Sequence, residues 1–555
     1  MNRLVKHILS VLSQKEKKLL AFQVLLNILI SIFDIAFIGL ILFVIHVYTS
    51  GEIIRNTYLP DYLADHNSLL LISISFILFS IKNYAGYLIS KSQYHFVYQV
   101  ASRISGNNLL NYLEGDYSSY VHTDSSVNIR KISQEPIEFS HYVLTGLQQL
   151  ITQGILIIFT LAAILIYNTT LFLLLFILLF PPVILVAAII RKKLKSAKIN
   201  AKTTSEKNMQ FLQESLSAYI ESNIYDKNEF FKNRYHRYQV QLNKYLSAQQ
   251  IIQGLPARLV EIFAVMGFFI LILLNRFSEG SSTISILTIG VFMGASYKII
   301  PGIVKILNSI GQMRAYEFTV DDLLTEKRKT SVISNQIDPP HLTSIEFTQV
   351  GFDFKKHKLF KPVNFKITQG DFIGIAGASG KGKTTLINLL LGFLEPTDGD
   401  IAINGKEENK WGRQRYWKRI SYLKQQPFFI HDTVLKNIIL SDNSYDASRL
   451  DQAISISGSE SLISQLPDGL NELIRENGKN LSGGQRQRIM LARALYKDFD
   501  LLILDESFSE MDEKSENVIL NQLKELSKKG KMILFITHNS SSLSFCDEII
   551  SLDEG

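Results

Sequence analysis

Long apolar stretches in the first 305 residues constrain the fold of this chain more than any other feature. A helix needs about 20 mainly apolar residues to cross the hydrocarbon layer of a membrane. Six stretches of the 555-residue chain meet this requirement, at about 19–48, 68–90, 139–167, 170–191, 258–276 and 282–305. Because helices satisfy their own backbone inside a bilayer, the sequence predicts an all-α membrane domain with six membrane-crossing helices.

The connections between these stretches alternate in length and charge. Segments 49–67, 168–169 and 277–281 are short and together carry more acidic than basic residues, whereas the other two connections are long and rich in Lys and Arg. Basic connections stay on the cytosolic side of a membrane. We therefore expect the short loops outside, and the long connections and both termini in the cytosol. Residues 51–66 mix apolar and charged side chains and could form a short helix on the outer surface.

The two long connections keep a helical spacing of apolar residues. Segments 91–114 and 196–250 contain few Pro or Gly residues, so the pattern favours helices. One interpretation is that they are amphipathic linkers. The other is that the membrane helices continue into the cytosol, with turns near 116–123 and 218–225 that contact the second half of the chain.

Three charged residues lie inside the apolar stretches, where an unpaired charge is costly. Glu261 is close enough in sequence to pair with Arg258 near a helix end, and Lys298 could extend to the membrane interface. Asp34 lies in the middle of its stretch, which favours a polar cavity between helices. Lys298 is also the best candidate for a cation that lines such a cavity and meets a charged head group.

The net charge of +7 does not indicate nucleic-acid binding. The basic residues gather where the apolar stretches meet the cytosol, as the positive-inside rule predicts; they are Lys15, Lys17, Lys18, Arg191, Lys192, Lys193, Lys195 and Lys198. The single cysteine, Cys546, excludes a disulfide within the chain. The first apolar stretch is longer than the core of a signal peptide, so no cleavable signal is expected.

Composition changes along the chain divide it into domains. We expect a transmembrane domain with long cytosolic helices at 1–325, a polar linker at 326–342 and a soluble α/β domain at 343–555. The linker carries the polar and Pro-containing pattern of a connection without regular structure.

Residues 377–384 of the soluble domain, GASGKGKT, match the phosphate-binding pattern GxxxxGK[ST]. The pattern follows an expected strand at 372–376 and opens an expected helix at 385–392, which is the context that it needs. In such a loop backbone N–H groups surround the phosphates at a helix N-terminus. Lys383 is then placed to reach the terminal phosphates, and Thr384 is placed to hold Mg²⁺.

A second motif, LLILDE at 501–506, has the pattern of a buried strand that ends in two carboxylates. Asp505 is placed to act on Mg²⁺, through a water molecule, and Glu506 is placed to polarise the attacking water as a general base. The alternative is a strand that simply ends in acidic residues, and the phosphate loop argues against it.

Residues 481–485, between these two motifs, read LSGGQ and resemble the signature of ABC ATPases. The resemblance extends to Gln425 in SYLKQQP, which matches the glutamine that senses Mg²⁺ and contacts the membrane domain; Gln426 is the alternative if the register differs by one. His538 in FITHN matches the switch histidine that contacts the terminal phosphate.

Two further segments resemble the family with departures from its usual pattern. Residues 509–512, SEMD, are similar to the loop that communicates across the ATPase dimer, which usually reads SALD. Phe354 in FDF has the place of the aromatic residue that stacks on adenine, which is more often Tyr. Stacking needs only a π-face, so Phe should serve.

The resemblance implies a role for each residue of the site. The implied catalytic residues are Glu506, His538 and Gln425, and the implied Mg²⁺ ligands are Thr384, Gln425 and Asp505. The residues implied to contact ATP are Phe354, Gly377, Ala378, Ser379, Gly380, Lys381, Gly382, Lys383, Thr384, Thr385, Ser482, Gly483, Gly484, Gln485 and Asp512.

The resemblance also implies an architecture and an assembly. The fold class is an all-α six-helix transmembrane domain of the ABC exporter type, followed by an α/β P-loop ABC ATPase domain. In the family the phosphate loop of one domain faces the signature of another with ATP between them. This chain has one intact copy of each, which implies a homodimer with two equivalent sites, placed in a bacterial inner membrane with the ATPase domains in the cytosol.

The cargo is indicated only by short patterns in the membrane half. LPARLVE at 255–261, ASYKIIPG at 295–302, the segment 51–66 and FDIAFIGLILFVI at 33–45 resemble flippases of lipid-linked oligosaccharides. We therefore expect the partners of the chain to be membrane lipid and an amphipathic substrate, most simply a lipid-linked one. A peptide, or a small toxin or drug, is the alternative cargo. A membrane-anchored regulator that moves nothing is disfavoured because Glu506 and the signature are both intact.

Overall fold

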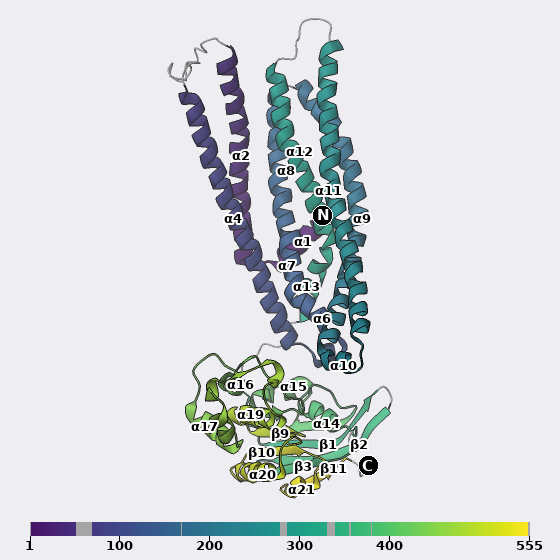
Figure 1. Cartoon of the computed structure of the whole chain (residues 1–555), viewed down its shortest axis with the longest axis vertical. Coiled ribbons are helices and arrows are strands. Elements are labelled where there is room, and N and C mark those ends of the chain that lie inside the picture. The colour runs from purple at the N-terminus through teal and green to yellow at the C-terminus, as the bar shows by residue number, and fades with distance from the viewer. Residues whose placement is uncertain are drawn as a thin grey trace. The chain divides into compact units, whose positions relative to one another are not determined.

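A computed structural model describes residues 2–50, 69–167, 169–277, 286–329, 339–354, 357–378 and 380–552. The chain divides into two compact units: residues 1–115 with 119–333, and residues 116–118 with 334–555. The first unit is helical and the second is built from strands and helices (Figure 1). The predicted order of fold classes is therefore confirmed.

The described part of the first unit contains helices and no strand. They are α1 (Asn2–Val11), α2 (Gln14–Ser50), α4 (Leu70–Leu113), α5 (Tyr117–His122), α6 (Ser125–Ile129), α7 (Glu135–Glu138), α8 (Thr145–Tyr167), α9 (Thr169–Ser217), α10 (Tyr219–Ile224), α11 (Asn228–Phe277), α12 (Ile286–Ala315) and α13 (Glu317–Lys329). Two π-helical stretches, Arg130–Gln134 and Phe139–Leu144, flank α7.

Three of the helices extend well beyond the predicted spans. Helix α4 continues from the second span to Leu113, α9 continues from the fourth span to Ser217, and α11 begins at Asn228, 30 residues before the fifth span. The short helices α5 and α10 occupy the two predicted turns. The helices are therefore continuous through the two long connections, and their contact with the second half of the chain stays a prediction.

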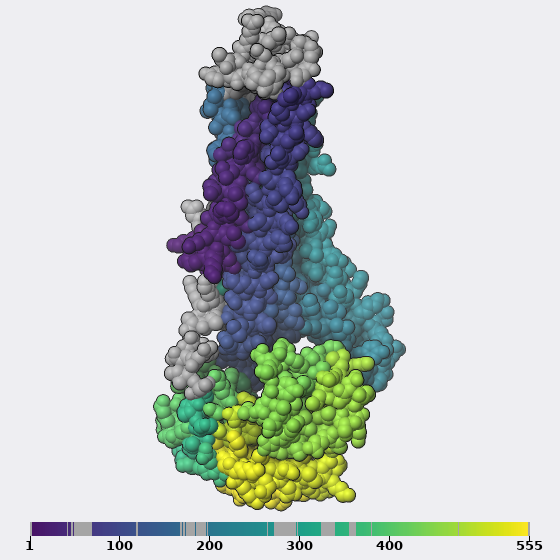
Figure 2. Space-filling view, turned by 90° about the vertical axis from the view of Figure 1, so that its left-hand side faces the viewer, coloured from purple at the N-terminus to yellow at the C-terminus, as the bar shows by residue number. Residues whose placement is uncertain are grey.

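Four helical segments among the described residues are long and apolar enough to cross a membrane. They are Gln14–Ile45, Leu70–Leu113, Ser125–Ile166 and Asn228–Ile270, and they make the chain a multi-pass membrane protein. The predicted spans 170–191 and 282–305 fall in α9 and α12, with residues 282–285 outside the described residues. Residues 51–66 also lie outside the described residues. In Figure 2 the surfaces of α2 and α4 run side by side.

A buried ion-pair network joins three elements of the first unit. Lys198 of α9 lies 3.1 Å from Glu138 of α7, and Lys202 lies 3.1 Å from Glu135 of α7 and 2.8 Å from Asp322 of α13. Lys198 is only 4% exposed. This basic residue of the predicted cytosolic boundary is therefore buried and paired with Glu138.

The second unit contains three sheets among its described residues. The strands are β1 (Ser344–Phe354), β2 (His357–Thr368), β3 (Phe372–Ala376), β4 (Asp398–Ile403), β5 (Lys406–Glu407), β6 (Ile420–Leu423), β7 (Asp432–Thr433), β8 (Leu473–Ile474), β9 (Leu501–Asp505), β10 (Met532–Ile536) and β11 (Glu548–Ser551). The central sheet is parallel with the order β11-β3-β10-β9-β6; an antiparallel sheet has the order β2-β1-β4-β5, and β7 pairs with β8.

The described part of the second unit also contains α-helices, some of which pack on the parallel sheet. They are α14 (Lys383–Leu390), α15 (Lys410–Gln414), α16 (Val434–Ile439), α17 (Ala447–Ile456), α18 (Glu460–Gln465), α19 (Gly483–Tyr496), α20 (Glu513–Lys528) and α21 (Ser540–Leu543). Side chains alternate across a strand. Leu501 and Ile503 of β9 therefore join the core that contains α14 and the antiparallel sheet, while Leu502 and Leu504 join the core that contains α19 and α20.

The register of the parallel sheet brings four strand ends together. Ile536 of β10 lies opposite both Ile375 of β3 and Asp505 of β9, and Leu423 of β6 lies opposite Leu504. Loops that follow the carboxyl ends of neighbouring parallel strands form the usual ligand site of such sheets. The segments after β3, β6, β9 and β10 contain most of the predicted site.

Candidate functional site

The phosphate loop joins β3 to α14, as the sequence predicts. Gly380 and Gly382 have φ angles of +83° and +91°, which glycine adopts without the steric cost that a side chain would add. Lys383 is 8% exposed, and its ammonium group donates to the carbonyl of Gly377 at 2.7 Å. The loop is therefore closed by its own lysine at the N-terminus of α14.

The two carboxylates at the end of β9 have different partners. Asp505 is 5% exposed and accepts a 3.0 Å hydrogen bond from the hydroxyl of Tyr422. Burial raises the pKa of Asp505, and burial followed by the charge of Asp505 raises the pKa of Tyr422. The Tyr422 hydroxyl is therefore a donor throughout the physiological pH range.

Glu506 has a positive φ of +46°, a conformation that costs energy for a residue with a side chain and is concentrated at functional sites. Its Oε2 accepts from Nε2 of Gln425 at 2.7 Å, and its Oε1 lies 3.3 Å from the ammonium group of Lys383. The structure therefore gathers Glu506, Gln425 and Lys383 at one place. It selects Gln425 as the residue of SYLKQQP that reaches this carboxylate.

The signature segment caps the N-terminus of α19. The Ser482 hydroxyl accepts from the backbone N–H of Gln485 at 3.4 Å, and the Gln485 side chain accepts from the backbone N–H of Ser482 at 2.9 Å. This reciprocal pair is a capping box. In Figure 1 α19, which follows the signature, and α14, which follows the phosphate loop, are separate helices of the second unit.

Residues 509–512 pack on the same helix α19. Gln487 donates to the Ser509 hydroxyl at 3.3 Å and accepts from the backbone N–H of Glu510 at 3.1 Å. Asp512 caps α20 by accepting from the backbone N–H of Ser515 at 2.9 Å. The two central residues that depart from the SALD pattern are therefore compatible with an ordered turn.

The remaining predicted residues lie around the strand ends. Thr384 is exposed in the first turn of α14, and His538 is exposed two residues after β10. Phe354 is the last residue of β1. Ser379 lies outside the described residues.

Comparison with known proteins identifies the family of the second unit. Residues 360–509 match the ABC transporter family. A solved structure of a bacterial Atm1-family ABC exporter with ATP bound aligns over 97% of this chain and 95% of its own, with a TM-score of 0.78 at 16% identity. The chain therefore has the fold of this exporter. Its second unit is an ABC ATPase domain fused to a membrane unit.

Relatives of known sequence share part of the chain. An export ATP-binding/permease protein of Rickettsia typhi is 35% identical over 47% of this chain and 46% of its own length. Two proteins named ATP-dependent lipid A-core flippase, from Burkholderia orbicola and Cupriavidus pinatubonensis, are 36% and 27% identical over 38% and 66% of this chain. Those matches cover 36% and 63% of the flippases. The chain thus matches less than two thirds of each of these relatives.

The ABC ATPase domain offers oxygen ligands that fit Mg²⁺. Thr384, Gln425 and Asp505 supply a hydroxyl, an amide and a carboxylate oxygen, and Mg²⁺ is usually held by one or two carboxylates together with substrate phosphates. Among the described residues no group of three or more His, Cys, Asp or Glu side chains could hold a metal alone. A donor set with one carboxylate suits a metal that is also held by the phosphates of a nucleotide.

The membrane unit holds a charge cluster that we call the Asp34 cluster, composed of Asp34 (α2), Lys82 (α4) and Lys298 (α12). Oδ1 of Asp34 accepts from the ammonium groups of Lys82 at 2.5 Å and Lys298 at 3.0 Å. Their side chains are 14% to 26% exposed. Glu261 instead lies 3.6 Å from Arg258, as the pairing interpretation predicts.

Two residues of these sites were not singled out in the sequence. Lys82 lies within the second predicted span, and its charge inside an apolar stretch was the signal that could have found it. Tyr422 is three residues before Gln425 in a strand, where an aromatic residue is ordinary. Only its bond to Asp505 distinguishes it.

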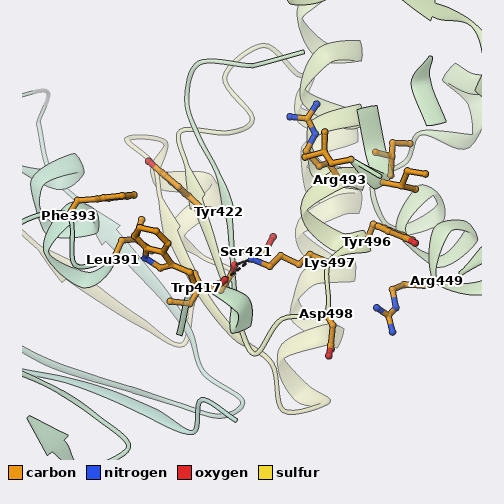
Figure 3. A pocket seen from close by; sticks show the side chains of 14 residues that line it. Leu391, Phe393, Trp417, Ser421, Tyr422, Arg449, Arg493, Tyr496, Lys497 and Asp498 are labelled. Atoms are coloured by element: carbon orange, nitrogen blue, oxygen red, sulfur yellow. Dashed lines mark hydrogen bonds between the residues drawn. The ribbon is translucent and has the colours of Figure 1, made fainter. Parts of the chain in front are cut away.

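A groove of about 550 Å³ lies beside the sheet edge of the ATPase domain (Figure 3). Its wall includes the aromatic rings of Phe393, Trp417, Tyr422 and Tyr496. Lys497 also lines the groove and donates to the carbonyl of Ile420 at 2.6 Å. Tyr422 thus has its ring in the groove wall and its hydroxyl on Asp505.

Proposed function

We propose that this chain hydrolyses ATP and uses the energy to export or flip an amphipathic, lipid-linked substrate across a membrane, by alternating access in a homodimer. The observation that carries the proposal is that Lys383, Glu506 and Gln425 lie together at the carboxyl ends of the parallel strands. The domain that contains them is fused to helices long and apolar enough to cross a membrane. Such a site has positioned groups for phosphoryl transfer to water.

Each residue has a defined part in hydrolysis. Lys383 contacts the terminal phosphates, and Glu506 takes the proton of the attacking water as general base. Gln425 holds the carboxylate of Glu506 through a 2.7 Å hydrogen bond. Thr384, Gln425 and Asp505 would hold Mg²⁺, which would supply positive charge to the phosphate oxygens. His538 contacts the terminal phosphate.

The homodimer follows from what one chain lacks. The phosphate loop precedes α14 and the signature precedes α19, and these helices are separate in the ATPase domain (Figure 1); we infer that one copy does not bring its own pair of motifs together. Two copies arranged head to tail complete two sites. Ser482, Gly483, Gly484, Gln485 and Asp512 of one copy then face the ATP held by the other.

The Asp34 cluster supports a substrate with an anionic head group. Two ammonium groups share one carboxylate oxygen, so the cluster carries one excess positive charge between three membrane helices. An uncompensated charge at this depth is costly unless it meets an opposite charge or water. A phosphate or pyrophosphate on a lipid provides that charge, and the names of the two flippase relatives agree with a lipid cargo.

Transport in reconstituted vesicles tests the proposal. ATP-dependent movement of a fluorescent lipid with a phosphate-bearing head group is expected, together with its stimulation of ATP hydrolysis. If an amphipathic peptide or a small dye is transported and the lipid is not, the assignment of a lipid cargo is wrong and the alternative cargo takes its place. If none of these compounds stimulates ATP hydrolysis and none of them is transported, export itself is contradicted.

Substitution of Lys298 tests the cargo assignment at the residue level. Lys298→Gln removes the excess charge of the Asp34 cluster, so we expect transport of the phosphate-bearing lipid to fall at least tenfold while basal ATP hydrolysis is retained. Lys305→Gln, on an exposed position of the same helix, is the matched control. Unchanged lipid transport in Lys298→Gln would assign Lys298 a purely structural pairing with Asp34.

A further inference from the structure

The segment that begins in β6 holds both carboxylates at the end of β9. Tyr422 donates to Asp505 at 3.0 Å, and Gln425, three residues later, donates to Glu506 at 2.7 Å. The parallel register sets this arrangement, because Tyr422 lies opposite Ile503, two residues before Asp505. One short segment therefore fixes the orientation of two consecutive acids.

The bond from Tyr422 occupies one defined oxygen of Asp505. It ends on Oδ2, and among the described residues no donor is bound to Oδ1. Asp505 is 5% exposed, so its carboxylate has little freedom to find a different partner in water. The Tyr422 hydroxyl bound to Oδ2 therefore fixes the orientation of the carboxylate plane of Asp505, and with it the direction in which Oδ1 points.

We propose that Tyr422 is a positioning residue for the metal, whose hydroxyl holds the carboxylate of Asp505 in the orientation that binds Mg²⁺ with ATP. This inference rests on the proposed ATP hydrolysis. Outer groups that hydrogen-bond a ligating carboxylate typically change metal affinity by 10- to 100-fold when they are removed. The alternative is that the bond only satisfies a half-buried hydroxyl, as tyrosine generally requires.

The two roles separate in a comparison of two tyrosines from one groove. Tyr422→Phe removes the hydroxyl on Asp505 and keeps the ring in the groove wall. Tyr496→Phe is the matched control, because Tyr496 lines the same groove and its hydroxyl accepts from the backbone N–H of Asp446 at 3.2 Å. Both variants lose one hydroxyl and one hydrogen bond, but only the first touches a metal ligand.

The measurement is Mn²⁺ affinity of the full-length protein with a saturating non-hydrolysable ATP analogue, from the electron paramagnetic resonance signal of free Mn²⁺. We expect affinity about tenfold weaker in Tyr422→Phe and unchanged in Tyr496→Phe. Nucleotide affinity in EDTA should stay within about twofold of the wild type in both, which also reports folding. Tyr422→Met, which fills space without a hydroxyl, repeats the test if Tyr422→Phe does not fold.

Two results would overturn the role of Tyr422: Mn²⁺ affinity equal to that of the wild type in Tyr422→Phe, or an equal loss in Tyr496→Phe. Failure of the proposed function is a different result. In that case the wild-type protein itself neither binds Mn²⁺ with the ATP analogue nor hydrolyses ATP.

Discussion

Glu506→Gln separates ATP binding from ATP hydrolysis, and the structure sets the size of both effects. Glutamine has the shape of glutamate, and its Oε1 still accepts from Gln425, whose bond is 2.7 Å in the native site. It cannot take a proton from water. Loss of a positioned general base lowers the rate by about 10²–10⁴, which corresponds to roughly 2.7–5.4 kcal/mol in the activation free energy.

The same substitution should not weaken ATP binding. Lys383 lies 3.3 Å from Glu506, and a phosphate must compete with this carboxylate for the ammonium group. A partly screened pair of this kind contributes up to about 1 kcal/mol. Removing it therefore leaves the dissociation constant for ATP unchanged or lowers it by up to roughly fivefold.

Steady-state hydrolysis by the purified protein and equilibrium binding of a fluorescent ATP analogue measure the two effects. Glu525→Gln is the control, because Glu525 pairs with Lys528 at 2.7 Å on the surface and lies outside the site. It should leave both quantities unchanged. Hydrolysis by Glu506→Gln within tenfold of the wild-type rate would refute the assignment of Glu506 as general base.

Three further predictions concern packing, the single thiol and assembly. A Cβ at Gly374 would lie 2.7 Å from Leu543 Cδ2 and 2.9 Å from Cys546 Sγ, so Gly374→Ala should destabilise the ATPase domain by about 1–3 kcal/mol; an unchanged midpoint of thermal unfolding would contradict this. Burial raises the pKa of Cys546 to about 12; at pH 8 the thiol is protonated, and maleimide labelling should be slow until the protein is denatured. Mixing Lys383→Ala with Ser482→Arg subunits should restore nucleotide trapping in verified heterodimers, since one composite site stays intact, and no trapping there would count against shared sites.

Local motifs made the ATPase domain predictable from its sequence. The phosphate loop and the carboxylates after β9 each join a strand to a following segment, so a short pattern contains all of the information. Their convergence also follows from sequence, because buried apolar runs favour a parallel sheet whose carboxyl ends share one edge. The two-residue strands β5, β7 and β8 are too short to produce a pattern.

Contacts between distant segments were less accessible to prediction. Tyr422 and Asp505 are 83 residues apart, and their contact depends on the pairing of β6 with β9. Pro301 and Gly302 fall in the sixth predicted span. In the structure α12 continues through both residues. A Cβ at Gly302 would lie 3.2 Å from Gln153 and Ile157 of α8, so this glycine permits close helix packing.

The charges in the membrane unit illustrate why helix rotation limits sequence analysis. A span is recognised from its mean composition, which does not depend on which side chains face one another. Asp34 and Lys298 are each conspicuous in an apolar stretch, but their 3.0 Å contact requires α2 and α12 to present these particular faces. Lys82 adds a second cation to the same oxygen. The net positive charge on which the proposed anionic substrate depends is thus a property of three helices together, and no single span contains it.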